Sequence, residues 1–351
     1  MHPPSEGNEP KVDPFSRGGE MLPHGDRWKL RRRETLSPFS LLELTDELVA
    51  RLRDGEKYSE DFDWVLGNLL QEELEKAFDY HNNRFGRRRY YDLLRPILAA
   101  IPRESLRGGT VVDLGCGRIH PFGFAFFFLL IGAERAFAVD LDPVEDWRRA
   151  AKNLATAASW MLLDSKRILD PDSIPPREVL ENLHGFDLPK LAAGDPGGIA
   201  QDRLVFLRED VYDLSLPEGT ADAVFSNSFL EHMSRLDDLL EAFRRITKIG
   251  GWGHHLVDFS DHRIYPGLVE SPFEFLKVET TDEMVNGANR LRCGQFCALF
   301  EKHGFAVEKV ETARHAPLTP QEQATLVEPF RSMSREDLER ICARIVVRRK
   351  R

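Results

Sequence analysis

The sequence has few cysteines, no long apolar run and no excess of positive charge, and each absence excludes a class of protein. Only four of its 351 residues are cysteine, and no two of them form a Cys-x-x-Cys pair. A zinc knuckle or a disulfide framework is therefore not indicated, and reduced thiols in the cytoplasm are the simplest interpretation. The most apolar run, residues 122–131, has about half the length that a transmembrane helix needs.

Charge and N-terminal composition narrow the choice further. The net charge of −10 argues against a nucleic acid as the main partner, because domains that bind nucleic acids usually carry a basic face. Residues 1–15 have no apolar core, so we expect no signal peptide and a cytoplasmic protein without a membrane partner. Residues 1–35 are rich in Pro, Gly and charge and are predicted to be a disordered tail. The basic run Arg27–Arg33 is interpreted as solvated, with contact to an anionic partner as the alternative.

Residues 36–105 are predicted to form a helical lead-in to the main domain. Leucines recur near helical spacing between Leu41 and Leu52, and an apolar stripe in Tyr90–Leu98 precedes Pro102. Such helices either pack on a sheet or cover the site that the sheet carries.

The stretch Thr110–Pro143 predicts a strand, a glycine turn, a helix and a second strand that ends in an acid. Val111–Val112 begin it, the turn is Asp113–Gly117, Phe122–Ile131 is the apolar helix, and the acid is Asp140. Glycines let a backbone approach a ligand closely, and an acid at a strand end can accept hydrogen bonds from a ribose. The sequence therefore predicts a nucleotide-like site at this turn.

The same stretch resembles motif I of class I S-adenosylmethionine (SAM) dependent methyltransferases, in which two apolar residues precede Asp-x-Gly-x-Gly. An NAD fingerprint would need a third glycine where His120 stands. The resemblance implies an α/β, Rossmann-like fold for residues 106–351, with a seven-stranded, mostly parallel sheet whose last strand is antiparallel. It also implies SAM as the cofactor. The gaps between the expected strands are longer than is usual in the family, so we expect helical insertions at about 144–203 and 260–292.

The run Phe206–Met233 resembles the middle motifs of this family, in which an acid after the third strand contacts adenine. Matching residues imply a cofactor site made of Asp113, Gly115, Cys116, Gly117, Asp140, Leu141, Asp210, Val211 and Asn227. In the second insertion, Asn289, Arg290 and Arg292 either bind an anionic or hydroxylated substrate or fasten loops.

A base that deprotonates the methyl acceptor is expected where the fourth and fifth strands end. The candidates are His232, His255, Asp258 and His262, and Asp261 next to His262 is a further proton-transfer partner. A metal site made of His254, Asp258 and His262 is the alternative. We expect no metal, because the acids that metal-dependent relatives place at strand ends have no clear match here.

The predicted activity is methyl transfer from SAM to an oxygen or nitrogen of a small molecule or glycan-like precursor. Two alternatives remain open at this point. One is a SAM-binding module with a scaffolding role, suggested by Ile119 in place of a glycine that the family often has. The other is a methyltransferase that acts on protein or RNA, for which the basic run in the tail is the only sequence support.

Overall fold

The structure is a computed structural model that describes residues 21–24, 27–30, 87–169 and 174–350. The chain divides into two compact units, Met1–Tyr90 and Tyr91–Arg351. In the first unit, β1 (Met21–His24) pairs antiparallel with β2 (Arg27–Leu30). These eight residues form a strand pair that the prediction of a disordered tail did not include, and for the rest of residues 1–35 that tail stays a prediction. The overlooked signal is Gly25-Asp26 between the strands, a pair typical of two-residue hairpin connections.

The remaining predictions for residues 1–35 lie outside the described residues, as does the helical lead-in up to residue 86. The last part of that lead-in is the helix α3 (Arg87–Ala100), which includes Pro96. Its described side chains Leu93, Leu94 and Ile97 are buried, as the apolar stripe predicts.

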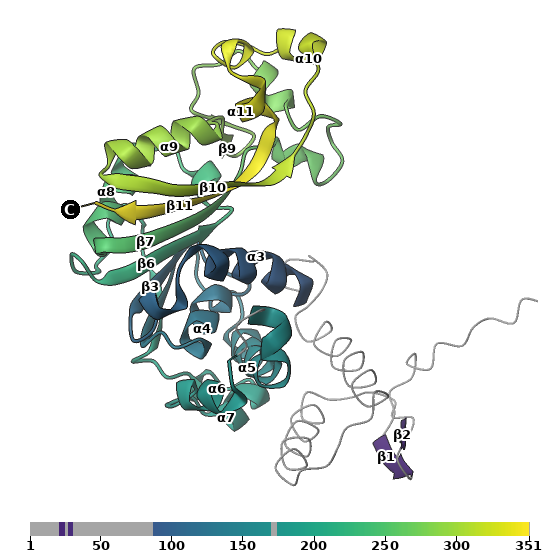
Figure 1. The fold of residues 1–351 in the computed structure, drawn as a ribbon, viewed down its shortest axis with the longest axis vertical. Coiled ribbons are helices and arrows are strands. Elements are labelled where there is room, and N and C mark those ends of the chain that lie inside the picture. Colours follow the sequence, from purple (N-terminus) through teal and green to yellow (C-terminus); the bar gives the residue numbers. More distant parts are fainter. Residues whose placement is uncertain (1–20, 25–26, 31–86, 170–173, 351) are drawn as a thin grey trace, which may run out of the picture. The chain divides into compact units, whose positions relative to one another are not determined.

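The second unit is built on a seven-stranded sheet in the order β10-β11-β7-β6-β3-β4-β5 (Figure 1). The strands are β3 (Thr110–Leu114), β4 (Arg135–Asp140), β5 (Leu204–Arg208), β6 (Ala221–Asn227), β7 (Thr247–Asp258), β10 (Phe305–His315) and β11 (Arg340–Arg349). The strands from β3 to β7 pair in parallel, and β11 is antiparallel to both of its neighbours. The predicted sheet, with its last strand antiparallel, is confirmed.

The strand order reverses beside β3. The chain moves from β3 to β4 and β5 on one side, then returns to place β6 and β7 on the other. Ligands of open α/β sheets bind at such a switch point, beyond the carboxyl ends of the strands. The fold therefore directs attention to the residues that follow Leu114, Asp140, Arg208, Asn227 and Asp258.

Helices cover both faces of the sheet because side chains alternate along each strand. On one face α4 (Gly123–Leu130) packs on the sheet, and its Phe128 ring stacks on Phe225 of β6 with centroids 4.0 Å apart. On the other face α8 (Leu236–Ile246) and α9 (Cys293–Lys302) bury an apolar cluster that includes Val224, the neighbour of Phe225. None of the helices in the described ranges has the length and apolar character that crossing a bilayer requires.

The first insertion is helical, as predicted, and is anchored by a buried arginine. It contains α5 (Trp147–Leu169), α6 (Pro176–Asn182) and α7 (Leu188–Ala193). Arg203 donates hydrogen bonds to the carbonyls of Asn182 and His184 after α6, and to Glu134 before β4. This side chain therefore fastens the end of the insertion to the sheet.

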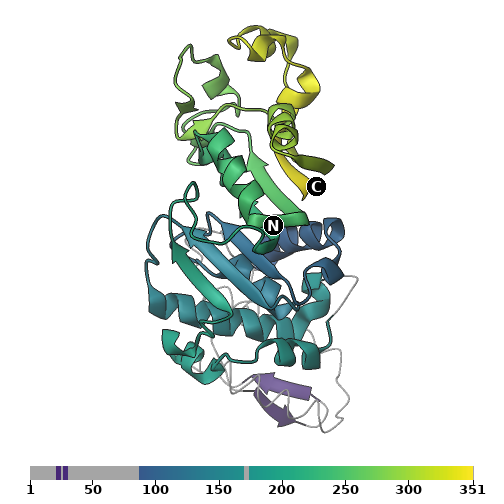
Figure 2. The same cartoon turned by 90° about the vertical axis from the view of Figure 1, so that its left-hand side faces the viewer.

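The second insertion differs from the prediction, because residues 260–292 contain no α-helix in the structure. They form two 3₁₀ turns, η5 (His262–Ile264) and η6 (Glu274–Lys277), and pair β8 (Met284–Val285) with β9 (Ala288–Asn289). Glycines and prolines, which end helices, interrupt this segment. Together with α10 (Pro320–Ala324) and α11 (Arg335–Glu339), this segment forms a part of the fold that we term the upper lobe (Figures 1 and 2). The upper lobe buries an apolar cluster of its own.

Buried polar side chains tie this upper lobe to the sheet. Arg292 is fully buried and donates to the carbonyls of Phe259, Leu338 and Arg340 at 2.5, 2.7 and 3.1 Å. Asn289 donates to the carbonyl of Leu230 at 2.8 Å. Of the two interpretations of the Asn-Arg-Leu-Arg run, these contacts correspond to loop fastening.

Candidate functional site

The glycine turn after β3 has the open backbone that its sequence predicts. Gly115 and Gly117 have φ angles of +67° and +80°, which residues with a side chain rarely adopt. The Gly115 N–H donates to the carbonyl of Val139 at 2.9 Å, so the turn is fixed to the end of β4. The Phe229 ring packs directly on Gly115, where an added Cβ would lie 2.2 Å from the ring. The turn is therefore held from both sides by elements that carry other site residues.

Asp140 ends β4 and faces the glycine turn. One carboxylate oxygen accepts from the Gly117 N–H at 2.8 Å and the other from the Asp142 N–H at 2.9 Å. Leu141 follows with 65% of its surface exposed. A carboxylate beside an exposed apolar side chain offers hydrogen bonds to a sugar and a flat contact to a base.

Asp113, the last acid before the turn, is buried and lies beside a second acid. Burial, with a smaller contribution from Asp140, raises the pKa of Asp113 to about 8. Burial also raises the pKa of the Cys116 thiol well above its usual value, helped by both acids. At neutral pH the Asp113 carboxyl is therefore mostly protonated.

Asp113 is therefore expected to make stability depend on pH. The folded pKa lies above the unfolded value of 3.8, so the folded state binds the extra proton and stability falls as pH rises from about 4 to about 8. Asp113→Asn should raise the free energy of unfolding at pH 7 by about 2–4 kcal/mol. Urea denaturation from pH 4 to pH 8 tests this, with the exposed Asp202→Asn as control. An unchanged difference between variant and wild type at all pH values would contradict it.

Asn227 lies at the end of β6, where the backbone is strained. Its side-chain oxygen is buried and has no hydrogen-bond partner among the described residues. Ser228, the next residue, has a φ of +50°, a conformation that non-glycine residues rarely take and that concentrates at functional sites. An orphaned buried acceptor indicates a ligand that donates a hydrogen bond.

Asp210 and Val211 follow β5, as predicted. The Asp210 carboxylate is exposed and accepts from the Tyr212 N–H at 3.0 Å, while Val211 is buried. The predicted cofactor residues therefore all lie at or directly after the carboxyl ends of β3, β4, β5 and β6. The glycine turn, the Asp140 carboxylate, the exposed Asp210 and the unpartnered Asn227 oxygen thus lie along one edge of the sheet.

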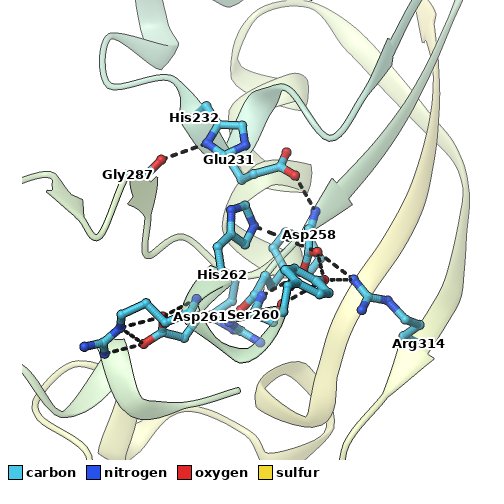
Figure 3. Close-up of polar contacts among 12 residues, drawn as sticks. Glu231, His232, Asp258, Ser260, Asp261, His262, Gly287 and Arg314 are labelled. Carbon is cyan, nitrogen blue, oxygen red and sulfur yellow. Dashed lines mark hydrogen bonds and ion pairs between the residues drawn. The ribbon is translucent and has the colours of Figure 1, made fainter. Parts of the chain in front are cut away.

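A second group of polar side chains gathers where β6 and β7 end, and we term it the acceptor cluster (Figure 3). It consists of Glu231 and His232 in the 3₁₀ turn η4 (Leu230–His232), Asp258 at the end of β7, and His262 in η5. The His232 and His262 rings meet edge to face with centroids 4.9 Å apart. Three of the four predicted catalytic residues are thus brought together.

Asp258 is the most heavily bonded member of the acceptor cluster. It accepts from the Ser260 hydroxyl and the Arg314 guanidinium at 2.6 Å each, and from the Tyr265 hydroxyl. Burial alone would raise the pKa of Asp258, but the Arg314 charge and the hydrogen bonds from Ser260 and Tyr265 outweigh it and lower the pKa. Asp258 is therefore a fixed carboxylate that orders its neighbours.

Glu231 and His262 keep free atoms beside this fixed carboxylate. Glu231 Oε1 accepts from the Asp258 N–H at 3.2 Å, whereas its Oε2 and the His262 Nε2 are buried without a hydrogen-bond partner in the described part of the chain. His262 Nε2 lies 3.8 Å from Asp258 Oδ2. Burial raises the pKa of Glu231 well above its usual value and lowers the pKa of His262. An uncharged imidazole and a buried carboxyl thus both face this site.

The structure places the remaining candidates elsewhere. His255 is buried on the helix-covered face, stacked between Phe243 and Phe300 and bonded to the Ser226 hydroxyl at 2.8 Å. Burial lowers its pKa to about 3, so it is a core histidine and not the substrate-facing residue predicted. Alternation along β7 correctly places His255 and His254 on opposite faces of the sheet. The face of His255, however, is the one that α8 and α9 cover.

Two further sequence interpretations change. His254 is buried and its pKa falls to about 3 through burial, and the structure does not gather it with Asp258 and His262 as a metal site would require. The Asp261 carboxylate bonds to the Arg263 guanidinium at 2.6 Å and not to His262.

Sequence reasoning also missed Tyr265 and Arg314 as parts of the site. Arg314 comes from β10, 56 residues after the Asp258 that it pairs with. Arg314 comes near Asp258 only through the order of the strands, in which β11 alone separates β10 from β7.

Comparison with known proteins gives a match to one family model. Residues 179–253 match the family model described as "Methyltransferase domain". No curated protein matches the chain.

Among solved structures, a SAM-dependent methyltransferase from Mesorhizobium loti is 18% identical, with 72% of this chain and 96% of that chain covered and a TM-score of 0.37. The geranyl diphosphate C-methyltransferase from Streptomyces coelicolor A3(2), solved with Mg²⁺, geranyl diphosphate and S-adenosyl-L-homocysteine, is 13% identical, with 80% and 98% covered and a TM-score of 0.38.

The matched segment runs from α6 to β7 and so includes Asp210, Asn227 and the strand ends between them. The glycine turn and Asp140, with the antiparallel strand β11 in the sheet, complete the pattern that the sequence resemblance implies. Residues 179–253 thus match a methyltransferase domain, and the sheet and the glycine turn of the chain have the pattern that the resemblance to class I SAM-dependent methyltransferases implies.

Proposed function

We propose that this protein transfers the methyl group of SAM to an oxygen or nitrogen of a small molecule or glycan-like precursor. The observation that carries this proposal is the short link between the two parts of the site. Only Ser228, Phe229 and Leu230 separate Asn227, at the cofactor end of β6, from Glu231 in the acceptor cluster. Cofactor and acceptor groups are thus held on one strand end.

SAM supplies an electrophilic methyl group on a sulfonium, and the task of the chain is to align an acceptor with it and to manage the acceptor proton. Alignment of this kind contributes about 7–11 kcal/mol to barrier reduction. Gly115, Gly117 and Asp113 would hold the methionine end, Asp140 the ribose and Asp210 the adenine. The orphaned Asn227 oxygen would accept a hydrogen bond from the same ligand.

The acceptor cluster would orient the acceptor and take its proton. Glu231 Oε2 and His262 Nε2 present free lone pairs there, and Asp258 fixes Tyr265 and Arg314 beside them. Removal of an acceptor proton by a positioned base contributes about two to four orders of magnitude in rate. His232 and His262 remain candidates for this role, and Asp258 is a positioning residue because its oxygens are engaged.

A small acceptor fits the charge of the chain better than RNA does. The net charge is −10, and phosphate backbones are bound by basic surfaces. The basic run that supported a macromolecular substrate lies in the unit Met1–Tyr90, and its residues 31–33 lie outside the described residues. The scaffolding alternative would be supported by SAM binding without turnover on every hydroxylated or aminated compound tried.

Asp140→Ala is expected to reduce SAM affinity by at least about tenfold, because a ribose loses a charged acceptor worth about 1.5–3 kcal/mol. Isothermal titration with SAM measures the effect. Asp202→Ala is the matched control, since this exposed acid precedes β5 at the opposite end of the sheet. Equal affinities of Asp140→Ala and wild type would refute the assignment of the cofactor site.

A further inference from the structure

Three potential metal ligands meet inside the acceptor cluster. Glu231, His232 and His262 each offer one ligand atom, and these atoms all lie within 4.8 Å of one another. They come from two turns, η4 after β6 and η5 after β7, which the sheet places side by side (Figure 3). The sequence predicted no metal and considered a different trio, so this grouping arises from the fold.

Two of the three residues each have a buried polar atom whose bonding capacity is unused. Glu231 is 1% exposed, and its Oε2 finds no donor within the described ranges. The same holds for Nε2 of His262. A buried polar atom without a partner costs about 1–3 kcal/mol, so an ion bound by both residues would offset two such costs.

The third ligand is held in the tautomer that metal binding needs. His232 Nδ1 lies 2.7 Å from the backbone carbonyl of Gly287, an acceptor, so Nδ1 carries the proton and donates. Its Nε2 is therefore left with a free lone pair. Histidines that bind metals almost always donate their other ring N–H to a carbonyl or carboxylate in this way.

We propose that Glu231, His232 and His262 bind a divalent transition-metal ion such as Zn²⁺ or Mn²⁺. Two imidazoles and one carboxylate suit these ions, whereas Mg²⁺ prefers oxygen ligands. Three protein ligands leave at least one position open, as in catalytic metal sites. Bonds of about 2.1 Å require the three atoms to draw together, and the exposed His232 ring has room to move.

The surrounding charges specify what the open position takes. Asp258 faces His262 but is already compensated by Arg314 at 2.6 Å. The charge of a divalent ion would therefore be balanced mainly by the Glu231 carboxylate, so the site would keep a net positive charge. Such a site favours an acceptor that binds as an oxygen anion, and a bound metal lowers the pKa of a hydroxyl. This last step rests on the proposed function and selects hydroxyl acceptors within it.

The test is a titration of the full-length protein, after treatment with a chelator, with ZnCl₂ and separately with MgCl₂. We expect one Zn²⁺ per chain and no saturable Mg²⁺ binding over the same range. Loss of an outer-shell partner of a metal costs about 10–100-fold in affinity, so loss of a direct ligand in Glu231→Gln or His262→Gln should cost at least about 100-fold. The Co²⁺-loaded protein should show a visible absorption spectrum that both variants lose.

His184→Gln is the matched control, because this histidine is exposed and its ring bonds to the Glu181 carbonyl of its own turn. Each variant is also titrated with SAM, which should bind as to wild type and so shows that the variant is folded. Zn²⁺ binding that is absent in wild type, or unchanged in Glu231→Gln and His262→Gln, would overturn the metal site. If Asp140→Ala loses SAM binding but retains Zn²⁺ binding, the cofactor site and the metal site are independent, and each proposal can fail without the other.

Discussion

Gly115→Ala is expected to lower SAM affinity by at least about 100-fold, a larger loss than the one expected of Asp140→Ala. An alanine Cβ at this position would lie 2.2 Å from Phe229 Cδ2, and the φ of +67° is itself unfavourable for a side chain. The strain of the left-handed conformation costs about 1–2 kcal/mol. The clash must also displace either the turn or Phe229, which follows the strained Ser228 at the end of β6.

Two further variants separate the clash from the backbone strain. Gly219→Ala carries the same strain at a φ of +64° with no atom within 4 Å of the new Cβ among the described residues, and it should bind SAM as wild type does. Phe229→Ala added to Gly115→Ala removes the clash and should recover about tenfold or more of the affinity. Isothermal titration of the four proteins decides. A double variant no better than Gly115→Ala would show that the contact with Phe229 is not the cause.

Arg292→Met is expected to cost about 3–5 kcal/mol of unfolding free energy, because each buried carbonyl left without its donor costs about 1–3 kcal/mol. Methionine fills a similar volume but leaves the carbonyls of Phe259, Leu338 and Arg340 without their donor. The cost is large because the side chain is fully buried. Burial lowers the pKa of Arg292 only to about 10, so it remains charged at neutral pH.

Arg290→Met is the matched control for Arg292→Met. It lies two residues away and donates to the carbonyls of Val278 and Thr280 at 2.7 and 3.2 Å, but it is only partly buried. Its loss should cost about 1 kcal/mol, the typical value of a hydrogen bond. Urea denaturation followed by circular dichroism measures both variants. Equal losses would mean that burial does not set the cost and that the upper lobe does not depend on Arg292.

The sequence predicted the sheet well, and it placed the candidate cofactor residues at strand ends, because both predictions rest on local patterns. Apolar runs that end in Gly115, Asp140, Asp210 or Asn227 can be recognised within a few residues, and parallel strands bring such ends to one edge. The hairpin near residue 25 was missed because composition outweighed a two-residue turn signal. The second insertion was predicted helical, although its glycines and prolines favour turns.

The acceptor cluster was predicted only in part, because its contacts are not local. His232 and His262 are recognisable as strand-end histidines, but Arg314 reaches Asp258 only through the order of the strands. His255 shows the other limit of the pattern. Alternation along β7 separates two faces, but only the packing of Phe243 and Phe300 shows that its face is covered.

The place of β11 in the sheet also constrains the order in which the fold assembles. β11 follows β10 in the chain but lies between β10 and β7, so β10 has no other strand of the sheet to pair with. Docking of β10 must therefore wait for β11, whose partner β7 lies about ninety residues earlier. Contacts between such distant segments slow folding. Until β11 is in place, one edge of β7 remains unpaired and open to pairing with another chain.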